Sequence, residues 1–144
     1  MEFRVVNETR QRLPRVQWIR IFNAVQRALK AWPKTSVALI FTTSVKIKKL
    51  NSAYRKKIIT TDVLSFPTDK LNAKDGSGDI LICPEYVKKK FPSSEFKKIL
   101  IHRFIHGLLH LHGYGHKSAK AAAKMEEKSQ EIINKISYGG HHAR

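Results

Sequence analysis

The chain has 144 residues, of which 42% are hydrophobic, so one compact domain with a substantial core is expected. It has no apolar run of about 18 or more residues and no signal-peptide pattern near its start, which argues against a membrane span or secretion. Its single cysteine, Cys83, cannot form an internal disulfide and fits a reducing compartment.

Positive charge dominates the sequence. Lysine and arginine total 28 against 11 acidic residues, which gives a formal net charge of +17. No acidic residue occurs between Glu8 and Asp62, or from Phe96 to Met125. A domain this basic repels itself, and binding a polyanion relieves the repulsion. Nucleic acid, held by its phosphates, is the expected polyanion, with a lysine-rich solvated surface as the alternative.

The first part of the chain predicts strands that alternate with helices. Residues 3–6 are expected to form a short strand, and residues 16–31 an amphipathic helix that ends before Pro33. Residues 36–43 are apolar and β-branched, which predicts a buried strand. The helix stripe expected to face the core comprises Val16, Ile19, Phe22, Val25 and Leu29.

The middle of the chain predicts a short helix and a hairpin. Ser44 is expected to cap a helix that runs to about residue 54, with Ile47 and Leu50 inward. Residues 63–66 and 79–83 predict two strands of a hairpin, joined by a segment rich in turn-forming residues.

The last third of the chain predicts helices. A short helical turn is expected to start at Pro84. A long helix capped by Ser93 or Ser94 should then run to about His112, where Gly113 would end it in a left-handed conformation. A last helix is expected over residues 118–136.

These elements together predict an α+β fold. We expect a small mixed β-sheet packed with helices in a single compact domain over residues 1–138, with a metal site in its C-terminal helical part. Residues 139–144 are expected to form a disordered tail.

Histidines cluster near the end of the long predicted helix. His106 and His110 are four residues apart, so both side chains would leave the same helix face. A turn at Gly113 would bring His116 back to them. Three imidazoles at about 2.0–2.1 Å leave a fourth zinc position for water, as in catalytic sites. The sequence therefore predicts one zinc ion per chain, although nickel or copper would also suit three histidines.

Other histidines are expected to have lesser roles. His102 lies one turn before His106 on the same face, so it is predicted either to compete as a ligand or to support one. His112 falls on another face and is expected to be exposed. The alternative for the whole cluster, ordinary surface or core histidines, accounts poorly for three at this spacing.

Three further blocks accompany the histidines: residues 50–57 (LNSAYRKK), 61–67 (TDVLSFP) and 78–80 (GDI). Together with residues 106–116 (HGLLHLHGYGH) they resemble, in order and spacing, the YbeY family of rRNA-maturation endoribonucleases. The resemblance extends over residues 3–136. It implies a single α+β domain with a zinc-type site.

The resemblance also implies a function. It implies a zinc-dependent endoribonuclease that cleaves single-stranded RNA in rRNA processing, including maturation of the 16S 3′ end, and in ribosome quality control. The expected partners are ribosomal RNA and the small ribosomal subunit, with a ribosomal or ribosome-assembly protein as a further partner. A cytoplasmic location without membrane association is expected.

Roles for individual residues follow from this resemblance. Arg55 occupies the position of the family's key arginine, and a guanidinium can bind two phosphate oxygens at once. We therefore expect Arg55 to act in catalysis, together with the metal ligand His106. Lys56 and Lys57, with Arg55, are expected to bind RNA. Asp62, Asp79 and His102 are accessory candidates, and a structural role is slightly favoured for both aspartates.

One position departs from the family pattern. The family usually has an aspartate before its last histidine, where this chain has Gly115. Such an acid could orient a ligand imidazole, so its absence could weaken metal binding. This favours a first alternative, a ribosome-associated RNA-binding factor with a structural metal and little cleavage.

A second alternative is a metallopeptidase. The histidine spacing matches a metallopeptidase helix, in which a glutamate that follows the first histidine serves as general base. Gly107 stands at that position here, so we rank this function lower.

Overall fold

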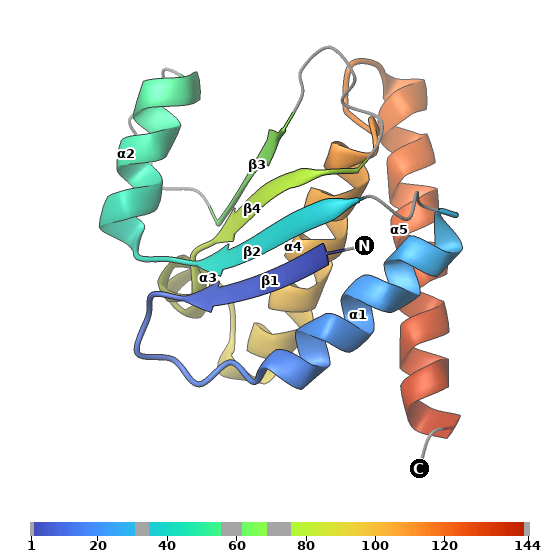
Figure 1. The fold of residues 1–144 in the computed structure, drawn as a ribbon, viewed down its shortest axis with the longest axis horizontal. Helices are drawn as coiled ribbons and strands as arrows, with labels where there is room; N and C mark the ends of the chain where they lie inside the picture. The colour runs from blue at the N-terminus through green and yellow to red at the C-terminus, as the bar shows by residue number, and fades with distance from the viewer. Residues whose placement is uncertain (1, 31–34, 56–61, 69–75, 143–144) are drawn as a thin grey trace.

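The computed structural model describes residues 2–30, 35–55, 62–68 and 76–142. Its strands are β1 (Glu2–Asn7), β2 (Ser36–Phe41), β3 (Val63–Pro67) and β4 (Gly78–Ile82). They form one mixed sheet in the order β1-β2-β4-β3 (Figure 1). β2 runs parallel to β1 and to β4, and β3 runs antiparallel to β4 as predicted. The predicted α+β fold with a small mixed sheet in one compact domain is confirmed.

Helices cover both faces of the sheet (Figure 1). The helical elements are α1 (Arg15–Ala28), α2 (Ser44–Arg55), α3 (Pro84–Lys90), the 3₁₀ turn η1 (Ser93–Glu95), α4 (Phe96–Leu111) and α5 (Ala119–His142). Leu39 of β2 is buried in a large core with side chains of α1, α4 and α5. Its neighbour Ile40 packs against a smaller cluster around Ile47 of α2 and the buried Cys83. The alternation of side chains along the strand thus divides the interior into two layers.

The buried face of α1 matches the predicted stripe only in part: Phe22 and Val25 are buried and Leu29 packs against the core. Trp18 is buried, and its ring packs 5.1 Å from that of Phe41 and 5.7 Å from that of Phe104, between centroids. Val16 and Ile19, which were expected to face the core, are 68% and 42% exposed. Trp18 and Ile21 are buried beside Phe22 and Val25 at helical spacing, so the buried face includes the indole and leaves Val16 and Ile19 outside it.

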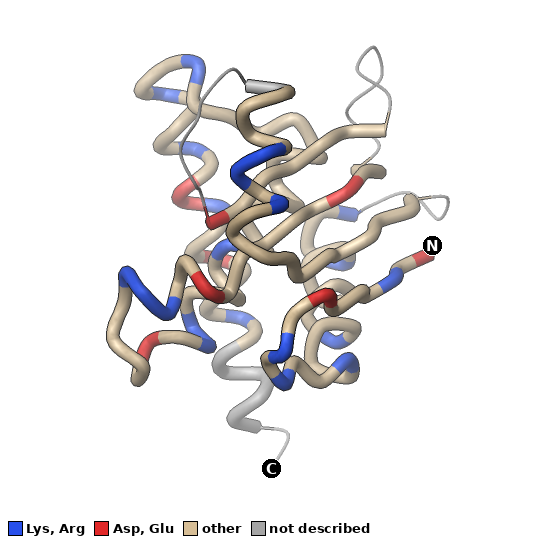
Figure 2. Tube along the Cα trace, turned by 90° about the vertical axis from the view of Figure 1, so that its left-hand side faces the viewer, with Lys and Arg blue, Asp and Glu red and all other residues tan. Residues whose placement is uncertain are grey.

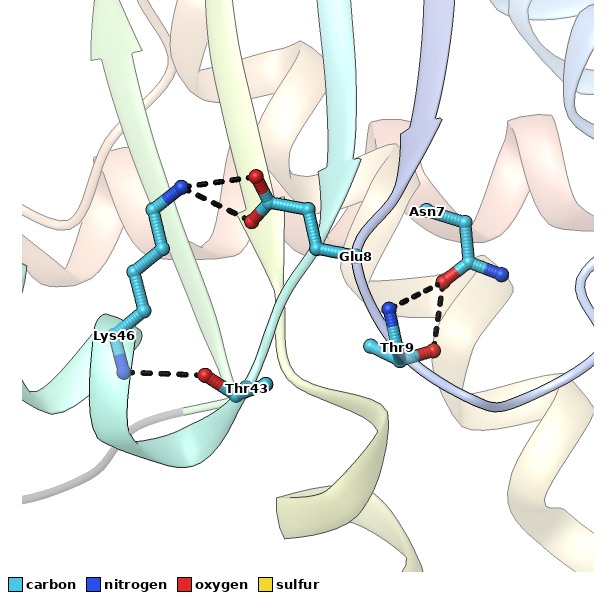
Figure 3. Close-up of polar contacts among 5 residues, drawn as sticks. All are labelled: Asn7, Glu8, Thr9, Thr43 and Lys46. Atoms are coloured by element: carbon cyan, nitrogen blue, oxygen red, sulfur yellow. Dashed lines mark hydrogen bonds and ion pairs between the residues drawn. The ribbon is translucent and has the colours of Figure 1, made fainter.

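The start of α2 also differs from the prediction. Thr43 caps the helix, because the Lys46 N–H donates to the Thr43 hydroxyl at 3.3 Å (Figure 3). The Ser44 hydroxyl instead donates to Glu85 at 2.7 Å. Lys46 Nζ contacts both carboxylate oxygens of Glu8 at 3.0 Å and holds the pKa of that carboxyl below its ordinary value. This ion pair ties the segment after β1 to the first turn of α2.

Two further helix ends depart from the predicted positions. α1 ends at Ala28, earlier than residue 31, because Lys30 adopts a left-handed conformation with φ of 51°. The predicted cap of α4 by Ser93 or Ser94 is wrong. Both residues lie in η1, and α4 starts at Phe96 without a side-chain hydrogen bond at its N-cap.

Helix α4 lies very close to strand β4 at Gly107. A Cβ atom at Gly107 would be 2.8 Å from Cγ2 of Ile80, which is shorter than real Cβ contacts. Glycine is therefore the residue that permits this approach. The buried side of α4 contributes apolar side chains to the large core, and these are Leu100, Phe104, Ile105, Leu108, Leu109 and Leu111.

The end of α4 is a glycine-terminated turn, as predicted. Gly113 has φ of 95°, its N–H donates to the carbonyl of His110, and the Tyr114 N–H donates to that of Leu109, both at 3.0 Å. This pair of bonds defines a Schellman motif. After the turn, Ser118 caps α5 through the Ala121 N–H at 3.0 Å, and α5 runs back along α4 (Figure 1).

No helix in the described part of the chain combines the length and the apolar character needed to cross a membrane. Helix α5 continues to His142, beyond the predicted end at residue 136, so that predicted end is wrong. The division into a domain over residues 1–138 and a disordered tail over residues 139–144 stays a prediction.

We predict that Gly107→Val lowers the free energy of unfolding by about 2 kcal/mol, because overpacking a tight core costs about 1–3 kcal/mol. The matched control is Gly115→Val, since nothing lies within 4 Å of a Cβ at Gly115. Urea unfolding of both variants measures the effect. A Gly107→Val protein as stable as its control would contradict the close contact with Ile80.

Candidate metal centre

Three histidines lie along one side of α4, away from its buried apolar side chains. His102, His106 and His110 are spaced by four residues and are half-buried. The rings of His102 and His106 lie 4.3 Å apart between centroids. Because residues four apart share a helix face, the contact between Gly107 and the sheet also fixes the side to which these imidazoles project.

The Schellman turn returns the chain toward His110. The ring of His116 lies 5.4 Å from that of His110 between centroids, so these two predicted ligands are brought together. His110 Nδ1 lies 3.1 Å from the carbonyl oxygen of Tyr114. A carbonyl only accepts hydrogen bonds, so Nδ1 carries the proton and Nε2 carries the lone pair. This is the tautomer in which a histidine binds a metal through Nε2.

Helix α5 adds a carboxylate to this face. Glu126 Oε2 lies 3.7 Å from His106 Nε2, and the Glu126 side chain is 60% exposed. Among the described residues, the donor atoms of His102, His106 and Glu126 form a group that lies within 4.8 Å of one another. This group could hold a metal ion.

His106 has the chemistry of a metal ligand. Burial lowers the pKa of His106 to about 4, with further lowering by the charges of His102, Arg103, His110 and His116. The imidazole is therefore neutral at pH 7. Its Nε2 atom is buried without a hydrogen-bond partner among the residues that the structure describes. A buried polar atom without a partner is costly, and coordination of a cation would satisfy it.

A guanidinium lies beside these imidazoles. Arg103 Nη1 is 2.9 Å from His102 Nδ1, and Arg103 Nε is 2.6 Å from Asp62 Oδ2. Burial, and next the charge of Arg103, lower the pKa of His102. His102 is thus also held neutral at pH 7.

Comparisons with known proteins agree with this architecture. The sequence model of the family described as endoribonuclease YbeY matches residues 5–137. The chain belongs to the YbeY family. It is 38% identical over 109 residues to an endoribonuclease YbeY from Bartonella quintana (strain Toulouse), covering 72% of this chain and 69% of the relative. It is 30% identical over 143 residues to one from Renibacterium salmoninarum, covering 92% and 91%.

A solved structure shares the fold. The solution structure of TM1509 from Thermotoga maritima matches 95% of this chain and 93% of its own, with a TM-score of 0.61 and 26% sequence identity. The resemblance to the YbeY family that the sequence motifs carry is therefore confirmed for the family and for the fold.

The structure places some of the residues that the YbeY resemblance singled out. Arg55 is the last residue of α2, and Lys56 and Lys57 lie outside the described residues. Asp62 forms the ion pair with Arg103, and whether its role is accessory or structural stays a prediction. Asp79 is exposed on β4, where it pairs with Phe66 of β3.

His112 does not lie exposed as predicted. It is half-buried, with Nε2 3.4 Å from Oε1 of the buried Gln26 of α1. A Cβ at Gly76 would collide with the His112 ring, so the segment before β4 also packs against it. The sequence pattern of α4 alone could not predict these neighbours, because they come from distant parts of the chain.

Two residues of this YbeY-type site were missed by the sequence reasoning. Glu126 follows the long acid-free interval and stands next to Met125, which is buried in the large core. An acid at the edge of the buried stripe of α5 was the sequence feature that could have indicated a site residue. No sequence feature indicated Arg103, because its position in the sequence does not distinguish it from the many other lysines and arginines of the chain.

We predict a pH effect on the stability of the metal-free protein. The pKa of His106 falls from 6.5 in the unfolded chain to about 4 in the folded one, so the unfolded chain binds the proton more tightly. This contribution to stability is complete above pH 6.5 and is lost as the pH falls toward 4, by on the order of 3 kcal/mol. Urea unfolding at several pH values measures it.

The matched variant for this prediction is His106→Asn, which keeps a neutral polar side chain. Its loss of stability between pH 7 and pH 4 should be smaller than that of the wild type. An equal loss in both proteins would show that His106 is not the buried neutral group described above.

Proposed function

We propose that this chain is a zinc-dependent endoribonuclease that cleaves single-stranded RNA, with the ion held by His106, His110 and His116. The observation that carries the proposal is the buried Nε2 atom of His106, which is neutral and has no hydrogen-bond partner in the described structure. It lies one helical turn before His110, whose tautomer also presents Nε2. The names of the YbeY relatives support RNA as the substrate.

The donor set suits the proposed ion. Three neutral imidazoles are typical zinc ligands and leave one position open for chemistry. When bound, zinc supplies Lewis acidity toward a phosphoryl oxygen and activates water near neutral pH. The protein's own contribution is the burial of His106, which keeps that imidazole neutral, and the hydrogen bond that leaves the Nε2 lone pair of His110 toward the proposed ion.

Arg55 is proposed to stabilise the charge that develops on the phosphate during cleavage. A guanidinium can donate to two non-bridging oxygens at once, which fits a phosphorane better than a lysine does. Lys56 and Lys57 are proposed to hold flanking phosphates. The position of Arg55 at the end of α2 supports this, since Figure 1 shows the C-terminal ends of α2 and α4 toward the same end of the molecule.

Ribosomal RNA is the proposed substrate, in processing of the 16S 3′ end and in ribosome quality control. The support is the family membership and the net charge of +17. Figure 2 shows lysine and arginine positions at many separate places along the chain, which suits binding to the phosphates of a polyanion. Association with the small ribosomal subunit in the cytoplasm, and contact with a ribosomal or assembly protein, belong to the same proposal.

One alternative has an observation in its favour. Gly115, in place of the family's aspartate, removes an acid next to the ligand His116, which favours an RNA-binding factor with little cleavage. The metallopeptidase alternative has an observation against it. Gly107 faces Ile80 in the core, so a glutamate there would have to enter the packed interior.

The first test compares wild type, His110→Ala and the control His112→Gln, all purified without metal-affinity resin. We expect about one zinc per chain by mass spectrometry in wild type and control, and loss of it in His110→Ala. Cleavage of an rRNA fragment with single-stranded ends should fall by more than about 100-fold in His110→Ala only. Absence of metal from the wild type would contradict the proposal.

The same assay separates a nuclease from a binding factor. Arg55→Ala should lower the cleavage rate by about 10²–10³-fold with a small change in RNA affinity, and Arg55→Lys should recover only part of the rate. Metal bound normally, with no cleavage by any of these proteins, would identify the binding factor instead.

A further inference from the structure

Two sets of metal donors on α4 compete for one atom. One set is the proposed His106, His110 and His116, and the other is His102, His106 and Glu126, whose donor atoms lie within 4.8 Å of one another. Both sets include His106, whose Nε2 atom lies 3.7 Å from Glu126 Oε2 and is also the donor proposed for the first set. One lone pair coordinates one cation, so an ion occupies one set or the other, and something in the protein must decide which.

Arg103 makes a hydrogen bond that fixes the position of the His102 proton. A guanidinium has donors only, so the contact of 2.9 Å between Arg103 Nη1 and His102 Nδ1 makes Nδ1 the acceptor. A neutral imidazole has one proton, which must then lie on Nε2. Neither nitrogen of His102 keeps a lone pair for a metal. His110 has the opposite tautomer, because its Nδ1 donates to the Tyr114 carbonyl.

The guanidinium is held in this position by its other contacts. Its Nε atom lies 2.6 Å from Asp62 Oδ2, with the two side chains 22% and 15% exposed. Its Cζ atom lies 5.7 Å from the centroid of the Phe91 ring. The backbone carbonyl of Asp62 accepts a hydrogen bond from the Cys83 N–H at 2.9 Å, which anchors Asp62 at the end of β4. The Arg103 guanidinium is therefore held by its contacts with Asp62, Phe91 and His102.

We propose that Arg103 is a positioning residue that selects the metal-binding set. It keeps His102 out of coordination and places a positive charge beside the His102, His106 and Glu126 group. An ion is thereby directed to His106, His110 and His116. The metal part of this inference rests on the proposed function, whereas the tautomer of His102 does not.

The tautomer is tested first, on the metal-free protein. Nitrogen NMR of the histidine side chains should place the His102 proton on Nε2 in the wild type and in Lys97→Met, a control that removes a cation from the same helix. In Arg103→Met combined with Asp62→Asn, which leaves no unpaired buried charge, the Nδ1–H form should become populated. A His102 proton on Nδ1 in the wild type would overturn the inference, whether or not the protein binds zinc.

Metal selection is tested by removing one ligand in two backgrounds. With Arg103 present, His116→Ala should weaken zinc binding by about 100-fold, measured by chelator competition. In the Arg103→Met/Asp62→Asn background, the same change should weaken it by less than about tenfold, because His102 and Glu126 can complete the set. When Glu126→Ala is added in that background, His116→Ala should again weaken zinc binding by about 100-fold.

Two outcomes of this second test are decisive. Equal losses in both backgrounds would overturn the role of Arg103 while leaving the zinc site itself intact. A wild type that binds no zinc would overturn the proposed function, and the NMR result would still stand alone. Where the double variant does not fold, Arg103→Lys replaces it, since a lysine can pair with Asp62 without the fixed second donor toward His102.

Discussion

The contact between Gly107 and Ile80 sets the position of helix α4, and the rest of the site depends on that position. Without a side chain at Gly107, the helix lies directly against β4, and its apolar side chains fill the large core. A helix fixed on one side has its opposite side fixed too. The position of the histidine face is therefore a consequence of core packing. His102, His106 and His110 lie on the side of α4 that does not pack against the sheet and the core.

Charge gives this face its chemical character. The imidazoles of His102 and His106 are neutral because they are partly buried among cations, and Arg103 is the nearest of these. Neutral nitrogen donors bind a divalent cation without cancelling its charge. Under the proposed function, such a centre in a chain with a net charge of +17 would attract phosphates, and Glu126 is the one acid that lies against His106 in the described structure. The neutral donors and the surrounding positive charge thus both fit the anionic substrate of the proposed function.

The sequence predicted those features that depend on local patterns. The strands, the helix of the histidines and the glycine turn at Gly113 all follow from residue type and spacing over a few positions. The family resemblance held for the same reason, because its blocks are short and contiguous. The prediction of Ser44 as the cap of α2 was wrong because its hydroxyl donates a hydrogen bond to Glu85, which is 41 residues away in the sequence.

Other features depend on which distant segments meet. With Trp18 buried, Val16 and Ile19 of the predicted α1 stripe are exposed, and Gln26 of α1 contacts His112. Glu126 and Arg103 are site residues because α5 and the segment that precedes β3 pack beside α4 in the folded chain. No periodicity within one helix contains that information.

The most direct test of this account is a crystal of the zinc-loaded protein with anomalous diffraction recorded at the zinc edge. The account predicts a single anomalous peak at about 2.0–2.1 Å from one nitrogen each of His106, His110 and His116. The hydrogen bond from Arg103 to His102 should still be present. A peak between His102, His106 and Glu126 would contradict it, because Arg103 would then not exclude His102 from coordination.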